Sequence, residues 1–261
     1  MRALIKLGGT LLDSPASRDV LARQITDARA NAEIVVVHGG GKQMTRYLAE
    51  RGIESHFVNG LRVTTPETID AVLKVFAGSV NHELVASLNR AGVRAVGLSG
   101  VDAFLVEAEQ MDPALGAVGR VTRANPALLD LLLAHQYTPV VACVAGDRDG
   151  RIYNVNADQM AVACAAACRV DHLVFLTDVN GVMDDTRQVR PTLASAECRR
   201  LIADGVATGG MQAKLNSALD ALAAGVAQVH IAPGATTEVV ARVLAGEDLG
   251  TRIIPTEVVT K

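Results

Sequence analysis

The chain has 261 residues, of which 49% are hydrophobic and 20% are charged, and its formal net charge is −3 at pH 7. This composition is typical of a soluble globular protein with a substantial core. The lack of excess positive charge argues against nucleic acid as the main partner. The most apolar stretch, residues 160–168, is far shorter than the roughly 20 residues that cross a bilayer, and the first residues lack the apolar segment of a secretory signal. We therefore expect a cytoplasmic enzyme or binding protein with no membrane partner.

Short apolar segments that predict strands alternate with helical patterns along the whole chain. The predicted strands are residues 3–7, 34–38, 94–98, 138–143, 172–177 and 228–232. Alternation of this kind is typical of a mainly parallel sheet with helices on both faces. The sequence therefore predicts an α/β fold, and because it contains no Pro/Ser-rich linker and no internal repeat, we expect a single domain over residues 1–261.

Capping residues mark the starts of three predicted helices. Thr65 followed by Pro66 begins a long helix that extends to about residue 90, since threonine caps a helix well and proline suits the first helical position. The pair Asn125 and Pro126 repeats this pattern.

Ser17 is expected to cap a helix over residues 17–30, and the amphipathic segment GMQAKLNSALDALAAG predicts a helix that stops at Gly225. Two β-rich segments, residues 56–63 and 103–121, interrupt the alternation of strands and helices.

The four cysteines indicate neither a disulfide framework nor a metal site. Cys164, Cys168 and His172 fall at i, i+4 and i+8. The Ala-rich helix is expected to end before His172, however, which places that residue in the next strand. The other two cysteines are isolated, and free cysteine commonly packs as a small buried hydrophobe.

Three segments with glycines or polar residues follow predicted strands. They are KLGGT (residues 6–10), HGGGKQ (38–43) and TDVNGVM (177–183). Ligands of open parallel sheets bind at the carboxyl ends of the strands, where glycines allow close approach and free N–H groups attract anions. None of the segments matches the P-loop or the dinucleotide fingerprint, and GLSGV fails the nucleophile-elbow pattern at Val101. Each loop alone is also consistent with a tight turn.

Polar residues in three further segments are candidates for a site. NVNADQMA (residues 154–161) places two asparagines and an aspartate where a strand gives way to a helix, and capping explains only one of them. Arg62 in GLRVT suits a carboxylate, although a solvent-exposed hairpin arginine is equally consistent. Lys214, behind TGGM, lies on an amphipathic helix, where a lysine usually faces water.

Taken in order, KLGG, HGGGK, GLRVT, NVNADQ, DVNGVM and TGGMQAKLNSAL resemble the amino acid kinase family, from Lys6 to the closing GTRI at residues 250–253. The resemblance implies a three-layer α/β/α sandwich around a mainly parallel open sheet. It also implies transfer of the γ-phosphoryl group of ATP, with Mg²⁺, to a small molecule. Within the family, the joint presence of GLRVT and NVNAD is most similar to members of arginine biosynthesis that phosphorylate the γ-carboxylate of N-acetyl-L-glutamate.

The resemblance also implies roles for individual residues. Lys6 and Lys214 would stabilise the transferring phosphoryl group, and Asp158 would position both lysines. The residues implied in acyl-substrate binding are Gly40, Gly41, Arg62, Asn154 and Asn156. Those implied in nucleotide binding are Gly8, Gly9, Gly39, Asp178, Val179, Asn180, Gly181, Val182, Met183, Thr208, Gly209, Gly210 and Met211.

In this scheme a lobe of about residues 1–170 binds the acyl substrate and dimerises, and a lobe of about 171–261 binds the nucleotide. A carboxylate with a pKa of roughly 4.3 is already ionised at neutral pH, so the reaction needs no general base. The barrier lies in bringing an anion to the γ-phosphate. Lysines, N–H donors and Mg²⁺ lower that barrier by stabilising the charge.

Three alternatives differ in the residues that they require. Other kinases of the family, including those acting on glutamate or aminoadipate attached to a carrier protein, share the lysines and glycines. A carrier would need a basic docking surface, which the net charge does not support. A catalytically inactive metabolite-binding homologue could lose Lys6, Asp158 or Lys214, all of which are present. A nicotinamide-dependent oxidoreductase would need a phosphate fingerprint that is missing.

The resemblance further implies a homodimer, since family members pair through helices of the first lobe. The helix from Pro66 carries apolar residues at Ile69, Val72, Leu73, Phe76 and Val80, more than a solvated surface would carry. Members that L-arginine inhibits resemble one another in an extra N-terminal helix. Because the first predicted strand begins at about Ala3, and the end reads LGTRII, we expect activity that is indifferent to L-arginine.

Overall fold

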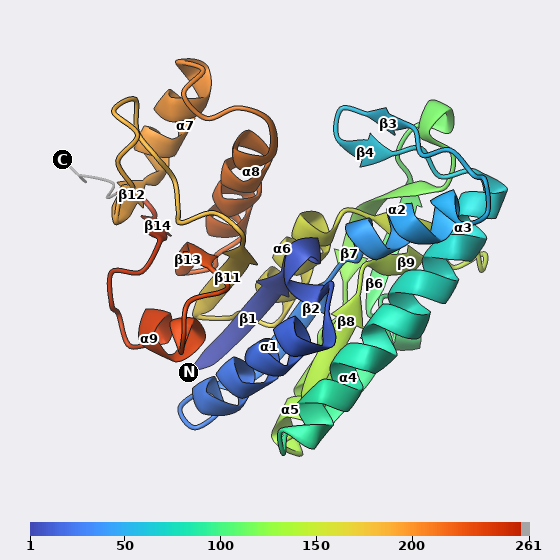
Figure 1. Ribbon diagram of the computed structural model, residues 1–261, viewed down its shortest axis with the longest axis horizontal. Coiled ribbons are helices and arrows are strands. Elements are labelled where there is room, and N and C mark those ends of the chain that lie inside the picture. Colours follow the sequence, from blue (N-terminus) through green and yellow to red (C-terminus); the bar gives the residue numbers. More distant parts are fainter. Residues whose placement is uncertain (257–261) are drawn as a thin grey trace.

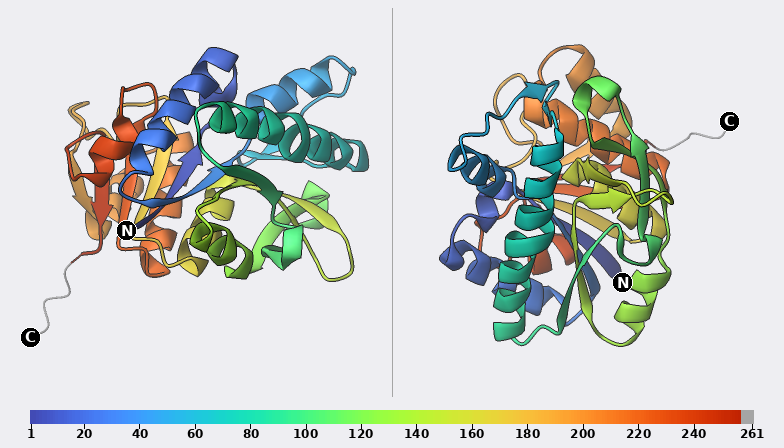
Figure 2. Two further views of the ribbon diagram at one scale, coloured as in Figure 1. Left: turned by 90° about the horizontal axis from the view of Figure 1, so that it is seen from below. Right: turned by 90° about the vertical axis from the view of Figure 1, so that its right-hand side faces the viewer.

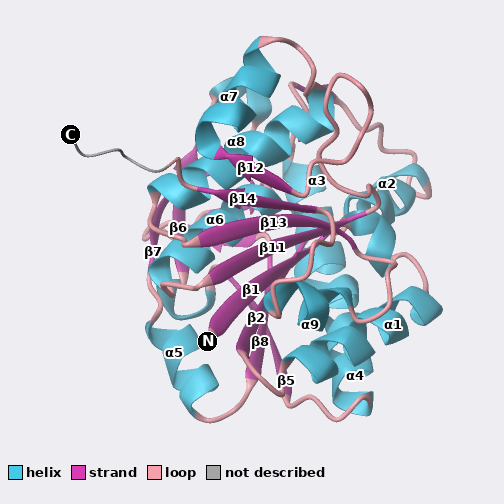
Figure 3. Ribbon diagram, turned by 90° about the vertical axis from the view of Figure 1, so that its left-hand side faces the viewer, coloured by secondary structure: helices cyan, strands magenta, loops and turns pink. Residues whose placement is uncertain are grey.

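The computed structural model describes residues 1–256 and is built around one large sheet (Figure 1). Eight strands lie in the order β12-β14-β13-β11-β1-β2-β8-β5, as Figure 3 shows edge to edge. These are β1 (Arg2–Leu7), β2 (Glu33–His38), β5 (Ala95–Ser99), β8 (Thr138–Ala142), β11 (His172–Thr177), β12 (Thr192–Ala194), β13 (Gln228–Pro233) and β14 (Thr251–Ile254). Every neighbouring pair is parallel except β13 with β14.

The sheet is covered on both faces by helices. One layer contains α1 (Pro15–Ala28), α4 (Asn81–Arg90) and α9 (Val239–Leu244); the other contains α5 (Ala127–Ala134), α6 (Ala157–Ala167) and α8 (Gly209–Ala223). In the left view of Figure 2 the blue and teal helices lie on one side of the strands and the green and orange ones on the other. The predicted three-layer α/β/α architecture is therefore confirmed.

The middle strands are apolar because both of their faces are covered. Residues 3–7 of β1 are all at most 8% exposed, and the neighbouring β2 and β11 are similarly buried. Such runs are the expected composition of a parallel strand buried on both faces. The register places Lys6, near the end of β1, between Val37 of β2 and Phe175 of β11.

A smaller sheet accounts for one of the two predicted β-rich segments. It contains β6 (Val106–Gln110), β7 (Val118–Ala124), β9 (Val144–Gly146) and β10 (Ile152–Val155). The other segment forms a two-stranded hairpin of β3 (Phe57–Val58) and β4 (Leu61–Arg62). Figure 1 shows this hairpin above α2 (Gly41–Ala49), at the same edge of the molecule as the ends of the central strands.

One of the three predicted helix caps is confirmed. The Thr65 hydroxyl accepts a hydrogen bond from Thr68 N at 3.2 Å, at the start of α3 (Pro66–Val72). The cap of α5 is Pro126 and not Asn125, although Asn125 Oδ1 accepts from Ala127 N at 3.1 Å. The prediction for Ser17 was wrong, because α1 begins at Pro15 and its cap is Ser14, whose hydroxyl accepts from Ser17 N at 3.1 Å.

The long helix predicted from Pro66 to about residue 90 is present as α3, a π-helical segment (Leu73–Val80) and α4, with a kink at Gly78. Gly78 in this segment has non-helical angles, φ −86° and ψ −106°. The π-segment shifts the register of the residues that follow it, since a π-turn adds a residue to the α-helical repeat.

The cysteines are free and buried, as predicted. α6 ends at Ala167, so that His172 lies in β11 and not on the helix of Cys164. Within residues 1–256, no group of three or more His, Cys, Asp or Glu side chains is arranged to hold a metal ion. Over the same residues, every helix is too short or too polar to span a bilayer.

Candidate active site

The predicted site residues gather where β11, β1 and β2 end. KLGGT follows β1, HGGGKQ follows β2 and TDVNGVM follows β11, and these three strands are neighbours in the sheet. Gly8 must approach β11 closely, because its N–H donates to Leu176 O at 3.1 Å and a Cβ at Gly8 would lie 3.1 Å from that same oxygen. The loop after β1 is therefore tied to the strand that leads into the predicted nucleotide segment.

Lys6, Asp158 and Lys214 converge although they come from three different elements. Lys6 Nζ lies 2.6 Å from Asp158 Oδ1, and Lys214 Nζ lies 3.7 Å from Asp158 Oδ2. Lys6 lies one residue before the end of β1, Asp158 lies in the first turn of α6, and Lys214 is on α8. Lys6 and Asp158 are 8% and 7% exposed, so their charges are poorly screened by water. The carboxylate thus holds two ammonium groups at one point.

Burial alone would raise the pKa of Asp158, but the ammonium groups of Lys6 and Lys214 outweigh burial and hold the pKa of this carboxyl below its usual value. An opposite charge within a few ångströms has this effect. Asp158 is therefore ionised at neutral pH and keeps both lysines paired and oriented.

Asn156 holds Asp158 in place from the preceding turn. Its Oδ1 accepts from Asp158 N at 2.8 Å and from Gln159 N at 3.2 Å, which caps α6. Asn156 also lines the neighbouring cavity. Asn156 therefore caps α6, a role that the sequence had left open, and it also borders the predicted acyl site.

A cavity of about 180 Å³ lies beside the charged cluster. Its polar walls are the glycines at 39–41 together with Arg62, Asn154 and Asn156, which are predicted site residues. Phe57, Phe76 and Cys143 contribute apolar walls that sequence reasoning did not identify. The thiol of Cys143 is not a candidate nucleophile, because burial raises its pKa to about 12.

Arg62 is the cation of this cavity. It is only 9% exposed, and its guanidinium donates through Nη2 to Thr45 Oγ1 at 2.8 Å and through Nη1 to Ser55 Oγ. The guanidinium carbon also lies 4.6 Å from the ring centre of Phe57. Burial lowers the pKa of Arg62, yet an arginine remains charged in proteins. The structure therefore provides a fixed, buried guanidinium suited to a carboxylate.

Asn154 lines the same cavity as Arg62 and is linked to it through a buried threonine. Asn154 Nδ2 donates to Thr64 Oγ1 at 3.0 Å, and the Thr64 hydroxyl donates to Arg62 O at 2.9 Å. Thr45, Ser55 and Thr64 were missed by sequence reasoning, because only the tertiary fold brings these hydroxyl groups to Arg62 and Asn154.

The predicted nucleotide segments lie on the other side of Lys6. Gly181 has φ +142°, and a Cβ there would lie 2.8 Å from Val189, so this turn requires glycine. Val182 is buried and its N–H donates to Thr251 Oγ1 at 2.8 Å, whereas Val179 and Met183 are exposed. Gly209, with φ +53°, opens α8 behind Thr208. The residues from Thr208 to Met211 thus form the N-terminal end of the helix that carries Lys214.

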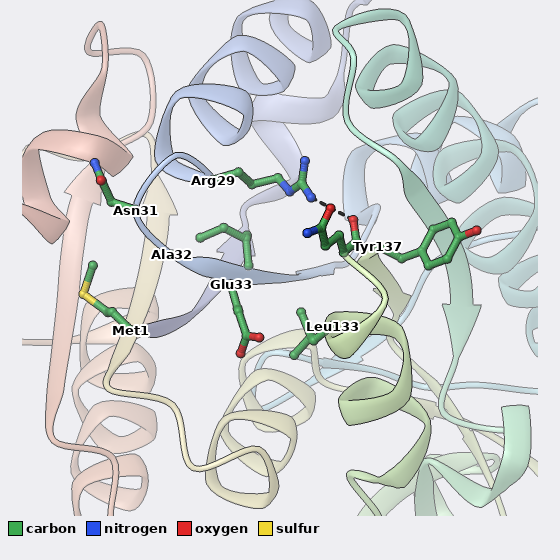
Figure 4. Close-up of a pocket in the computed structure, with 9 residues that line it drawn as sticks. Met1, Arg29, Asn31, Ala32, Glu33, Leu133 and Tyr137 are labelled. Carbon is green, nitrogen blue, oxygen red and sulfur yellow. Dashed lines mark hydrogen bonds between the residues drawn. The ribbon is translucent and has the colours of Figure 1, made fainter.

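A different cavity, of about 530 Å³, opens at the opposite edge of the sheet, where β1 and β2 begin (Figure 4). Its charged side chains form hydrogen bonds with other parts of the protein. Arg29 Nη2 donates to the carbonyl of Gln136 at 2.8 Å, and Glu33 accepts from Arg2 Nε at 2.9 Å. The predicted site residues lie at the other end of the strands, with the lysine cluster.

Comparison with known proteins agrees with this geometry. The sequence profile of the amino acid kinase family matches residues 1–233. An acetylglutamate kinase of Solibacter usitatus (strain Ellin6076) is 72% identical over 255 residues, which cover 97% of this chain and 99% of that protein.

Two solved structures are similar in fold. The crystal structure of smu.665 from Streptococcus mutans UA159 has a TM-score of 0.82 and 29% identity over 97% of this chain and 98% of that chain. The N-acetylglutamate synthase of Neisseria gonorrhoeae, complexed with coenzyme A and N-acetyl-glutamate, has a TM-score of 0.85 and 24% identity over 98% of this chain and 60% of that one. On the strength of the profile match and the Solibacter relative, the chain belongs to the amino acid kinase family.

Proposed function

We propose that this chain transfers the γ-phosphoryl group of ATP to the γ-carboxylate of N-acetyl-L-glutamate, giving N-acetyl-L-glutamyl 5-phosphate and ADP. The observation that carries the proposal is the Lys6–Asp158–Lys214 cluster beside a small cavity with a buried Arg62. The 72% identity to an acetylglutamate kinase supports the choice of acceptor. The reaction belongs to arginine biosynthesis, and we place it in the cytoplasm, where ATP is formed and used.

The acceptor would enter the cavity with its α-carboxylate on Arg62 and Asn154. Its γ-carboxylate would then face the lysine cluster, and as an ionised nucleophile it needs no proton acceptor. Lys6 and Lys214 would stabilise the negative charge of the phosphoryl group during transfer, while Asp158 keeps them oriented. We further propose that residues up to about 170 form the acyl site and those from 171 the nucleotide site.

Mg²⁺ would arrive with the nucleotide. The absence of a protein cage of three or more His, Cys, Asp or Glu side chains within residues 1–256 fits a metal ligated chiefly by phosphate oxygens and water. When bound, Mg²⁺ neutralises charge on the phosphates. Asp178 directly follows β11, and its carboxylate accepts from the Thr177 hydroxyl at 3.1 Å. It is the carboxylate of the predicted nucleotide segment that lies nearest to the end of β11 in the sequence.

The activity is tested by trapping the acyl phosphate with hydroxylamine. With MgATP and N-acetyl-L-glutamate, we expect hydroxamate and ADP in equal amounts, and much slower reaction with unacetylated glutamate. Turnover of glutamate, aspartate or UMP at the same rate would contradict the proposed acceptor.

Arg62→Ala should raise KM for N-acetyl-L-glutamate about 10- to 10²-fold, the range expected for a hydrogen bond to a charged group. kcat should stay nearly unchanged, because an interaction that is equal in ground and transition states affects KM alone. KM for ATP should also stay nearly unchanged, because Arg62 lines the acyl cavity. Arg51→Ala is a matched control, since exposed Arg51 stacks on Tyr47 outside the cavity. Weakened ATP binding in the Arg62 variant would show that the two sites are wrongly placed.

We also propose a homodimer, on grounds that differ from those of the sequence prediction. Val72, Phe76 and Val80 are buried within the chain, so the apolar residues of the long helix do not by themselves indicate a partner. The terminal strand β5 instead presents an open sheet edge, which proteins commonly pair or cover, and exposed Phe104 lies just beyond it. Light scattering should give twice the chain mass of 27.3 kDa; a monomer would contradict the proposal.

A further inference from the structure

The carbonyl groups of the glycine loop, residues 39–41, are all bonded within the protein. Gly39 O accepts from the ring of its neighbour His38 at 2.8 Å. The carbonyls of the next two glycines accept from Met44 N at 2.8 Å and from Thr45 Oγ1 at 2.9 Å. The N–H groups of the same three glycines have no acceptor among residues 1–256. The loop therefore presents free N–H donors where it lines the cavity, an arrangement that attracts anions.

His38 is fully buried and has one proton arrangement that fits its partners. A carbonyl only accepts, so Nδ1 must carry the proton that bonds Gly39 O. Nε2 of the neutral ring is then an acceptor, and Asn81 Nδ2 lies 2.9 Å from it. Burial lowers the pKa of His38 to about 4, which keeps the ring neutral at physiological pH. Both ring nitrogens are thus matched to a partner.

Asn81 is itself fixed from two sides. It is 2% exposed, and its Nδ2 also donates to Val140 O of β8 at 2.9 Å. These two bonds set which end of the amide faces His38. Gly97 of β5 makes room for the amide, because a Cβ there would overlap Asn81 Oδ1.

The π-helical segment brings both Asn81 and two apolar side chains to the glycine loop. Asn81 directly follows the segment Leu73–Val80. A Cβ at Gly40 would lie 2.9 Å from Phe76 Cδ1 and 3.3 Å from Val80 Cγ2. The segment therefore contacts Gly40 through Phe76 and Val80, and the residue that follows it, Asn81, contacts His38. π-turns of this kind are frequent at functional sites.

The peptide between Gly39 and Gly40 connects this network to the cavity. A trans peptide is planar, so its carbonyl oxygen and its N–H point in opposite directions. Anchoring Gly39 O on the buried ring of His38 thus turns the N–H of Gly40 away from the core. Gly40 lines the cavity, whereas His38 does not.

We propose that His38 and Asn81 are positioning residues that fix the Gly39–Gly40 peptide and thereby aim the N–H groups of the glycine loop at the acyl substrate. The role rests on the proposed function, because it assigns a use to donors of the acyl cavity. Neither residue touches substrate; both act through the loop.

Substitutions that keep or remove one hydrogen bond at a time test this role. In His38→Asn the amide nitrogen can replace Nδ1 as donor to Gly39 O, whereas His38→Leu removes the donor and Asn81→Leu removes the partner of Nε2. We expect the two Leu variants to raise KM for N-acetyl-L-glutamate and lower kcat, by about 10- to 10²-fold in kcat/KM. KM for ATP should change little, and His38→Asn should recover most of the loss. His82→Gln, on the next residue of α4 and bonded to Gly78 O at 2.9 Å, is the matched control.

Nitrogen-15 NMR of the histidine rings provides a readout that does not depend on turnover. We expect His38 to be protonated at Nδ1 only, in the whole enzyme without substrate. Protonation at Nε2, or losses in the Leu variants that merely follow the fraction unfolded in urea, would overturn the positioning role. An active wild type with unaffected Leu variants would overturn the role alone. A wild type that phosphorylates no N-acetyl-L-glutamate would overturn the proposed function and this role with it.

Discussion

Lys6→Ala and Lys214→Ala should each lower kcat by at least about 10²-fold, the usual loss when one pre-organised donor to a transition state is removed. The two lysines meet at Asp158, at 2.6 and 3.7 Å, and both charges would act on the same phosphoryl group. Removing either one leaves its share of the developing charge unbalanced. The measurement is steady-state kcat with saturating MgATP and N-acetyl-L-glutamate.

Replacing Lys6 should also lower the free energy of unfolding, whereas replacing Lys214 should not. Lys6 is buried and supplies the closer partner of Asp158, while Lys214 is more exposed. Lys6→Met keeps the volume of the side chain and is therefore the better test of charge alone. Lys74→Ala, which removes an exposed lysine paired with Asp70, is the control. A kcat within tenfold of wild type for either catalytic lysine variant would refute the roles assigned to the pair.

Lowering the pH from 6.5 to 5 should reduce the free energy of unfolding by about 3 kcal/mol, through two buried histidines that each lose up to about 1.36 kcal/mol for each pH unit below the unfolded pKa. Burial lowers the pKa of His38 to about 4. Burial, with neighbouring His172 and Arg252, lowers the pKa of His230 to about 3. Since both values lie below the roughly 6.5 of an unfolded histidine, the unfolded chain takes up protons first. The stabilisation is complete above that pH and is lost as the pH falls towards the folded values.

Urea unfolding at a series of pH values measures this loss. Asp158 does not contribute between pH 6.5 and 5, because its pKa is lowered in the folded chain and an unfolded aspartate titrates near 3.9. His230→Leu should remove about half of the pH dependence, and the exposed His56→Gln variant should leave it unchanged. The same slope in wild type and His230→Leu would contradict the assignment.

Much of the fold could be predicted from the sequence, because buried parallel strands are continuous apolar runs. The six predicted strands all occur, with ends that differ by at most one residue. Strands β12 and β14 were not predicted, since runs of three and four residues carry too little pattern. The predicted cap of α1 was wrong, although Ser14 followed by Pro15 is the same kind of signal as the Thr65 and Pro66 that begin α3.

The site could be predicted only from the ordered motifs, and not from local patterns. Lys6, Asp158 and Lys214 lie far apart in sequence, and periodicity alone left Lys214 as a surface lysine. Only the ordered motifs grouped the three, and the structure brings them together. Their roles in catalysis stay a prediction. The contacts of Thr45 with Arg62 and of Asn81 with His38 had no sequence signal, since they depend on how α2 and the π-helical segment pack.

The central place of β1 has a consequence for how the enzyme is made. β1 is synthesised long before one of its two neighbours, β11, which begins only at His172. Pairings between such distant segments form late and slowly. Lys6 cannot meet Asp158 and Lys214 until the last third of the chain has been synthesised and has packed. An incomplete chain therefore has no assembled charge cluster, and phosphoryl transfer reports completed folding.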